Sequence, residues 1–115
     1  MKKICLIVLF GLAAATAYAQ TGGFSGPDGR PLVTALEVQE LADDTHVRLV
    51  GYIVRKTGDE EYEFKDDSGT LIVEIDDDDW HGLEVSPTDK VELTGEVDKE
   101  RTGNTIDVDS IRLVK

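Results

Sequence analysis

Residues 46–113 contain five runs in which apolar and polar residues alternate, separated by turns rich in glycine and aspartate. Alternation with a period of two places every second side chain on the same face of a β-strand. The expected strands are 46–56, 61–65, 70–76, 90–98 and 105–114. Their solvent-facing positions are mostly acidic. The pattern therefore predicts a small β-protein with a negatively charged surface.

Two glycines, Gly51 and Gly95, fall in the middle of expected strands. A glycine at such a position typically marks a bulge or a sharp bend, which lets one strand serve both halves of a barrel. Within 105–114, Ile106 and Val108 fall on one face of the expected strand, whereas Ile111 and Leu113 fall on the other. That change of parity predicts a bulge near Asp109 and Ser110.

The connection between the third and fourth strands is longer than the others, and Thr34 and Glu37 have the spacing of a capping box. We therefore expect a helix of two turns that starts at Thr34 and ends near Asp43 and Asp44, with Leu36 and Leu41 docked on the barrel. The fold class predicted is all-β with small α content: a five-stranded Greek-key OB-fold barrel preceded by a short N-terminal helix. Tyr62 and Phe64 are expected to point into its core.

The first nineteen residues have the parts of a secretory signal peptide: Lys2 and Lys3, an apolar run at 4–15, and an A-x-A site ending at Ala19. The apolar run is shorter than the roughly 20 residues of a membrane-spanning helix. We expect cleavage after Ala19 and export to the periplasm, without insertion in the membrane. Residues 20–33 then form a Gly/Pro-rich N-terminal arm, and residues 34–115 form a single OB-fold domain.

The chain carries 24 acidic and 12 basic residues, a formal net charge of −12. This excess argues against nucleic acid and anionic membranes as partners, because both require clustered Lys and Arg. It permits cationic partners such as metal ions, polyamines and basic peptides. Cys5 lies in the expected leader, so the exported chain would have no disulfide, thiolate metal site or thiol nucleophile.

Four consecutive aspartates, Asp76–Asp79, form the densest charge in the chain. Adjacent carboxylates suit Ca²⁺ or another hard cation, but the EF-hand spacing is absent, with His81 at the glycine position and Pro87 at the position of the bidentate Glu. The alternative is that these aspartates cap a helical turn at Trp80. We predict no metal site, with the four aspartates as the candidates if one exists.

Trp80 either fills one end of the barrel or offers a stacking platform at its mouth. His46 and His81 are isolated, which does not favour zinc. No serine has the G-x-S-x-G context of a nucleophile. We therefore expect neither an enzyme nor a cofactor.

Many OB-folds bind single-stranded nucleic acid on strands 2 and 3 through aromatic rings and positive charge. Here those strands present Glu61, Glu63 and Glu74 outward and no aromatic residue. This face and its neighbouring loops supply the candidate ligand-binding residues, which are Tyr52, Glu61, Glu63, Glu74, Asp76, Asp77, Asp78, Asp79 and Trp80.

Short motifs follow one another in a particular order and spacing: 23–27 (GFSGP), 47–51 (VRLVG), 62–66 (YEFKD) and 95–99 (GEVDK), with Trp80 between the last two. In this the chain resembles the bacterial OB-fold (BOF) family of periplasmic stress-tolerance proteins, the YgiW/YdeI type, over residues 23–114. The resemblance implies a soluble periplasmic OB-fold protein, linked to envelope or oxidative stress, without enzymatic activity.

The leading hypothesis is a monomeric periplasmic protein that binds a small or cationic ligand through its acidic face. The alternatives are a module that docks on another envelope protein through Ile72, Val50, Val54 and Phe24, or a binder of peptidoglycan fragments. An envelope hydrolase has no support among these residues.

Overall fold

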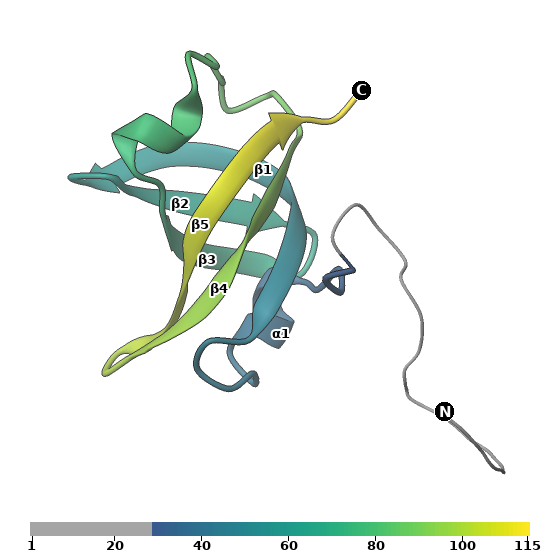
Figure 1. Ribbon diagram of the computed structural model, residues 1–115, viewed down its shortest axis with the longest axis vertical. Helices are drawn as coiled ribbons and strands as arrows, with labels where there is room; N and C mark the ends of the chain where they lie inside the picture. The colour runs from purple at the N-terminus through teal and green to yellow at the C-terminus, as the bar shows by residue number, and fades with distance from the viewer. Residues whose placement is uncertain (1–28) are drawn as a thin grey trace, which may run out of the picture.

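In the computed structural model, residues 29–115 form a closed five-stranded β-barrel with one short helix (Figure 1). The strands are β1 (His46–Gly58), β2 (Glu61–Asp66), β3 (Gly69–Glu74), β4 (Val91–Glu100) and β5 (Gly103–Leu113). Their order around the barrel is β1-β2-β3-β5-β4; β3 and β5 pair in parallel and the other neighbours pair antiparallel. The predicted OB-fold class is confirmed. The expected leader and residues 20–28 of the arm lie outside the described residues.

The core consists of the apolar residues that alternate along the strands, together with one face of the helix. Its buried hydrophobic side chains are Ala35, Val38, Val47, Leu49, Ile53, Phe64, Leu71, Val73, Ile75, Val91, Leu93, Val97, Ile106 and Val108. Phe64 is buried as predicted, whereas Tyr62 is only half-buried and packs against the edge of the core.

Both mid-strand glycines lie where another strand approaches closely. A Cβ on Gly51 would lie 2.6 Å from Cζ of Phe64 and would also meet the Lys65 carbonyl oxygen. A Cβ on Gly95 would meet the Asp107 carbonyl oxygen. The bend that they permit is what allows β1 and β4 to curve around the barrel.

The predicted bulge in the last strand is present. Thr94 pairs with Ser110 and Gly95 pairs with Val108, so that Asp109 is the extra residue on β5. The bulge restores the alternation, because it lets Val108 on one side and Ile111 on the other both face the hydrophobic core.

The helix α1 (Ala35–Val38) has the capping box that the sequence predicts, but it is one turn long rather than two. The prediction that Leu36 docks on the barrel is wrong, because Leu36 is 65% exposed while Ala35 and Val38 are fully buried. Leu41, the other residue expected to dock, is half-buried against the core.

Side chains from other elements set the orientation and the length of α1. Asp66, the last residue of β2, and Ser68, in the turn that follows, accept hydrogen bonds from the backbone N–H groups of Ala35 at 2.8 Å and Leu36 at 3.0 Å. At the other end, the buried Asn104 donates from Nδ2 to the carbonyl oxygens of Val38 and Leu41, both at 2.9 Å. Asn104 thus satisfies the carbonyl oxygen of Val38, the last residue of the helix, while backbone N–H groups of the following turn bond the carbonyls of Leu36 and Glu37.

A buried carboxylate holds the last part of the arm on the barrel. Glu92 of β4 is 4% exposed, and its Oε2 lies 2.7 Å from Nη1 of Arg48, while its Oε1 pairs with Arg112 of β5. Arg48 in turn donates to the carbonyl oxygens of Arg30 and Pro31 at 2.9 and 2.8 Å. Residues 30–33 therefore run alongside β1. No helix in residues 29–115 is long and apolar enough to cross a membrane.

Replacing Gly51 by alanine should lower the free energy of unfolding by about 1–3 kcal/mol, the usual cost of overpacking a core. Its methyl group would meet the Phe64 ring and the Lys65 carbonyl, both part of the barrel wall. Urea unfolding followed by circular dichroism measures the change. Gly58→Ala is the control, because the atoms nearest to its methyl group belong to the flexible Glu61 side chain, and it should cost less than about 0.5 kcal/mol. Equal losses in the two variants would contradict the explanation.

Candidate functional site

The closed barrel brings four carboxylates into one row across neighbouring strands. Glu61 on β2 pairs with Glu74 on β3, Glu74 pairs with Asp107 on β5, and Asp107 pairs with Glu96 on β4. Directly opposite residues on one face of a sheet have side chains close enough to interact. We call Glu61, Glu74, Asp107 and Glu96 the carboxylate row; on β1 it ends at His46, which pairs with Glu96.

Burial and the charges of neighbouring carboxylates raise the pKa of two members of the row. Burial raises the pKa of Glu74, and the charges of Asp107, Asp98, Asp76 and Glu61 raise it further. Burial also raises the pKa of Asp107, with added contributions from Asp109, Asp76 and Asp98. The carboxylates of this surface therefore hold protons more tightly than isolated carboxylates do, and a cation bound among them would relieve their repulsion.

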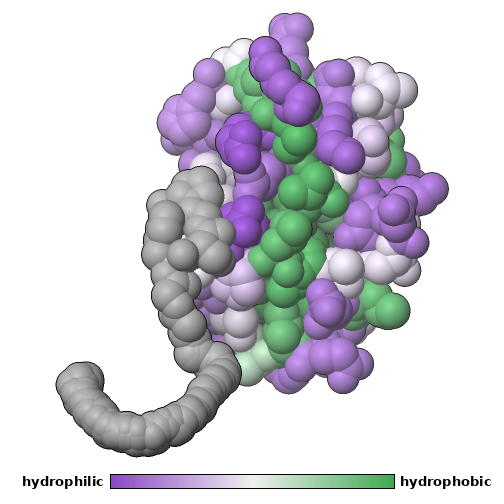
Figure 2. All heavy atoms as spheres, turned by 90° about the vertical axis from the view of Figure 1, so that its right-hand side faces the viewer, coloured by the Kyte–Doolittle hydropathy of each residue, from purple (hydrophilic) through white to green (hydrophobic). Residues whose placement is uncertain are grey.

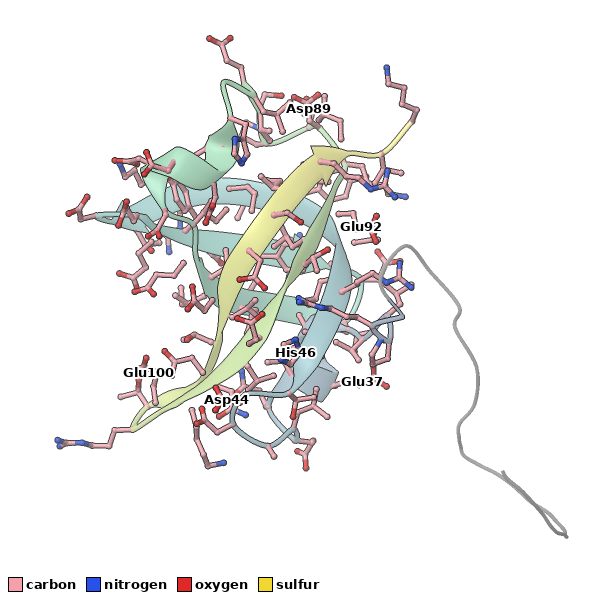
Figure 3. All side chains as sticks on the ribbon, in the orientation of Figure 1. Glu37, Asp44, His46, Asp89, Glu92 and Glu100 are labelled. Atoms are coloured by element: carbon pink, nitrogen blue, oxygen red, sulfur yellow. The ribbon has the colours of Figure 1, made fainter. Side chains whose placement is uncertain are left out.

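Other carboxylates border the row and extend it toward the end of β4. A hydrogen bond with Asp98, and the charge of Asp98, raise the pKa of Glu100. Figure 3 shows Glu92 and Glu100 at opposite ends of β4, so the buried Glu92 is not part of this surface. We call the carboxylate row together with Asp76, Asp98 and Glu100 the acidic face.

The β4 end of the row is occupied by the chain's own cation. Nη1 of Arg30 lies 3.1 Å from Oδ2 of Asp109 and 3.4 Å from Oε2 of Glu96, and Nδ1 of His46 lies 3.7 Å from the same Glu96 oxygen. A hydrogen bond with Asp109, together with burial and the Asp109 charge, raises the pKa of Glu96 to about 7. Burial acts to raise the pKa of Asp109, but its hydrogen bonds with Glu96 and Arg30 outweigh that effect and lower it.

The structure brings some of the candidate residues together and separates others. Glu61, Glu74 and Asp76 lie on the acidic face. Glu63 is one step further along β2, and its Oε1 accepts a hydrogen bond from Nε of Arg55 at 2.5 Å. Only part of the predicted set therefore forms one surface.

The other acidic candidates lie on a 3-10 turn, η1 (Asp77–Trp80), in the connection between β3 and β4. Asp77 and Asp78 are exposed and Asp79 is half-buried. The predicted capping by these aspartates is wrong: the Asp76 side chain makes no capping bond, and the Asp77 N–H donates to Oε2 of Glu60 at 2.8 Å. The turn ends at Trp80 rather than starting there, and its first N–H group, that of Asp77, is bonded by Glu60 of the β1–β2 turn.

Tyr52 lies apart from the acidic face. It is on the outer side of β1, opposite Lys65 of β2, and lines a shallow hollow of about 350 Å³ with Asp66 and Ser68. This hollow borders the N-terminus of α1, so nothing in its position joins Tyr52 to the carboxylate row.

Trp80, the last residue of η1, lines a separate groove. Figure 1 shows the η1 turn, between β3 and β4, at the end of the barrel away from α1. The Trp80 ring meets Tyr62 edge to face, with centroids 5.5 Å apart and planes at 74°. Nζ of Lys56 lies 5.8 Å from the centroid of Tyr62. The groove has a volume of about 500 Å³, and aliphatic residues of β1 and of the 83–87 connection complete it. Trp80 thus packs against the core and also presents a surface to solvent.

No three His, Cys, Asp or Glu side chains in residues 29–115 converge closely enough to hold a metal ion. The acidic face is therefore a spread surface of negative charge rather than a preformed coordination site. Such a surface attracts cations over a distance, and the attraction is weakened by salt.

Sequence reasoning missed Asp107, Glu96, Asp98 and Glu100. Asp107 and Glu74 become neighbours only because β3 and β5 run side by side. The alternation in 105–114, together with the strand order of an OB-fold, was the available signal, since both place Asp107 on the outer side next to the third strand.

Comparisons with known proteins agree with this fold. A model of the family described as "Bacterial OB fold (BOF) protein" matches residues 11–113. The chain is 38% identical over 116 residues to the calcium-regulated OB-fold protein CarO of Pseudomonas aeruginosa, covering 100% of this chain and 98% of CarO. It is 48% identical over 128 residues to the protein YgiW of Escherichia coli K12, covering 99% and 98%. The solved structure of the hypothetical protein ygiW from E. coli superposes with a TM-score of 0.72, covering 82% of this chain and 100% of that one.

The Glu96–Asp109 pair should make the stability of the barrel depend on pH. The pKa of Glu96 is raised in the folded state from 4.5 to about 7, so between these values the folded chain holds more protons than the unfolded chain. Stability from this group is therefore present at low pH and is lost as the pH rises through about 7. The lowered pKa of Asp109 acts in the opposite sense, but only at more acidic pH.

Glu96→Gln should accordingly match the wild type at about pH 4, below the unfolded-state pKa, and be more stable than the wild type at about pH 8, because the glutamine mimics the protonated carboxyl. Urea midpoints at the two pH values measure this. Glu40→Gln, which changes an exposed carboxylate outside the acidic face, is the control and should show no such difference. A Glu96→Gln variant that becomes less stable than wild type as the pH rises would refute the assignment.

Proposed function

The chain belongs to the bacterial OB-fold (BOF) protein family, and from this membership we propose that it is a non-enzymatic periplasmic protein whose acidic face binds a small cationic ligand. Its role would be in tolerance of envelope or oxidative stress. The signal-peptide pattern of residues 1–19 supports that compartment. The observation that carries the proposal is the carboxylate row.

The carboxylate row works against the stability of the barrel. Like charges directly opposite each other on a sheet are destabilising, by a few tenths to about 1 kcal/mol for each pair. In the row, three successive strand pairs place carboxylate against carboxylate. A bound cation would remove this repulsion. The free energy released in this way would favour binding of the cation to the carboxylate row.

The same charges count against nucleic acid as the ligand. OB-folds that hold single strands combine stacked aromatic rings with a positive groove. Here Glu61 and Glu74 occupy the outward positions of β2 and β3, and the aromatic Phe64 is buried in the core. Placing a phosphate chain on this face would bring negative charge onto negative charge.

Ca²⁺ is the first cation to test. The name of the relative CarO describes that protein as calcium-regulated, and oxygen-rich surfaces suit this hard cation. Because the carboxylates are spread over four strands, we expect weak affinity, with a dissociation constant on the order of 10⁻⁴ to 10⁻³ M, as in loosely built calcium sites.

The experiment compares the wild type with a Glu74→Gln/Asp107→Asn double variant. In the absence of divalent cations the double variant should melt at a higher temperature, because the central repulsion of the row is gone. Adding Ca²⁺ or spermidine should raise the melting temperature of the wild type and should raise that of the variant much less. Calorimetric titration at low and high salt should show an affinity that falls as salt is added.

The control is Glu40→Gln/Asp67→Asn, which makes the same change of net charge at exposed positions outside the acidic face. It should keep the response of the wild type to both cations. Equal cation responses in the two double variants would mean that only net charge matters, and the acidic face would then be abandoned as the binding surface.

A second candidate function is docking on another envelope protein. Leu32 and Leu36 are 56% and 65% exposed. Figure 2 shows a band of hydrophobic residues along one face of the molecule, with hydrophilic residues on both sides of it. Of the contacts expected from the sequence, Ile72, Val50 and Val54 are only half-buried and Phe24 lies outside the described residues.

If this second function holds, Leu36→Glu should abolish a specific crosslink to an envelope protein in periplasmic extract, since it puts a charge into an apolar contact. Thr102→Glu, an exposed position in the β4–β5 turn, is the control and should keep the crosslink. Mass spectrometry of the crosslinked bands provides the readout. Identical band patterns for wild type and both variants would eliminate this function.

A further inference from the structure

We propose that the groove beside Trp80 is a second binding site, which takes a small amphipathic anion: one or two rings that carry a carboxylate. This site is separate from the acidic face and does not rest on the function proposed for that face. The acidic face is formed by β2, β3, β5 and β4, whereas the groove is formed by the second half of β1, Tyr62 and the connection that follows η1.

The walls of the groove suit an apolar ring. Trp80 and Tyr62 form one side, and Ile53, Val85 and Pro87 contribute aliphatic surface. Its volume of about 500 Å³ lies within the usual range for small-molecule sites, which are mostly apolar with a few polar groups. The two rings meet edge to face and hold each other in place, so the wall is formed before a ligand arrives.

The polar groups around these walls are hydrogen-bond donors. Within the part of the chain that the structure describes, neither the indole N–H of Trp80 nor the hydroxyl of Tyr62 makes a hydrogen bond. Partly buried Tyr and Trp side chains usually have a partner for these groups. The available donors therefore favour a ligand that brings acceptor oxygens.

A positive charge beside the groove also favours a ligand with a carboxylate. Among the described residues, Arg30, Arg48, Arg55 and Arg112 each pair with a carboxylate. The ammonium of Lys56 instead lies over the Tyr62 ring and forms no ion pair within residues 29–115. In a chain with twice as many acidic as basic residues, this cation remains available for a ligand carboxylate.

Two nearby carboxylates would repel an anion in the groove and so limit its affinity. Glu84 also lines the groove, and Asp79 directly precedes Trp80. Their repulsion should keep the affinity modest. Because salt screens this repulsion as well as the attraction of Lys56, binding in the groove should depend on salt much less than cation binding on the acidic face.

The test uses three probes that share one ring system and differ in charge: 1-naphthoate, 1-naphthalenemethanol and 1-naphthylmethylammonium. The chain has one tryptophan, so the indole N–H of Trp80 gives one cross-peak in a nitrogen–proton correlation spectrum. The peak should shift and saturate with naphthoate, more weakly with the alcohol, and most weakly with the ammonium. Lys56→Glu should weaken naphthoate binding about tenfold, which corresponds to roughly 1.4 kcal/mol.

Lys99→Glu is the matched control, because it makes the same charge change at an exposed residue of β4 outside the groove. It should leave naphthoate affinity within about twofold of the wild type. Lys56→Gln provides a milder second variant if thermal melting shows that Lys56→Glu is unfolded. The Glu74→Gln/Asp107→Asn variant should bind naphthoate normally, so this proposal and the one for the acidic face can fail separately.

Three results would overturn the proposal. The first is a preference for the ammonium probe over naphthoate. The second is an equal effect of Lys56→Glu and Lys99→Glu. The third is a shift of the Trp80 peak that never saturates, which would mean nonspecific association only.

Discussion

The parallel pairing of β3 with β5 closes the barrel, and the acidic face exists only because of that closure. The pairing consists of two residue pairs, Val73 with Ile106 and Glu74 with Asp107. Val73 and Ile106 are fully buried, and burying such side chains contributes about 1.5–3 kcal/mol each. The adjacent carboxylates oppose the pairing by about 1 kcal/mol or less. The apolar pair therefore outweighs the acidic pair, and the barrel can hold two carboxylates against each other without opening.

Basic side chains are distributed in a way that leaves this repulsion in place. Arg48 and Arg112 are committed to the buried Glu92, which would be costly to leave without partners. Arg30 lies against Glu96 and Asp109, at the β4 end of the row. Burial and neighbouring carboxylates raise the pKa of both central residues, Glu74 and Asp107, so their charges are not cancelled by the fold. A ligand cation at the centre of the row would do what Arg30 does at its end.

Alternation in the sequence was sufficient to predict the strands, the inward residues and the bulge at Asp109, because these depend on local parity. Features that depend on distant partners were not accessible in this way. The one-turn helix α1 offers too few positions for its periodicity to decide which face is buried; Asp66 and Ser68 decide it, and they expose Leu36. Glu60 likewise meets the N–H of Asp77 from another turn. Of the acidic face, Glu61, Glu74 and Asp76 could be predicted from the outward parity, while Asp107, Asp98 and Glu96 required the strand order.

Two surfaces with opposite ligand preferences can coexist on one small barrel. The net charge of the molecule acts over a long distance, whereas individual hydrogen-bond donors and charges act only at contact. The net charge of −12 produces a field that gathers cations around the whole molecule, but at physiological salt that field decays over about 8 Å. Within contact distance, hydrogen-bond donors and individual charges decide what stays bound. On the acidic face, the local carboxylates and the net charge of the molecule both attract cations, so the attraction should be strongly salt-dependent. Beside Trp80, the ammonium of Lys56 and the indole and hydroxyl donors oppose the field, so a ligand there must owe most of its binding energy to the ring and only the remainder to its charge.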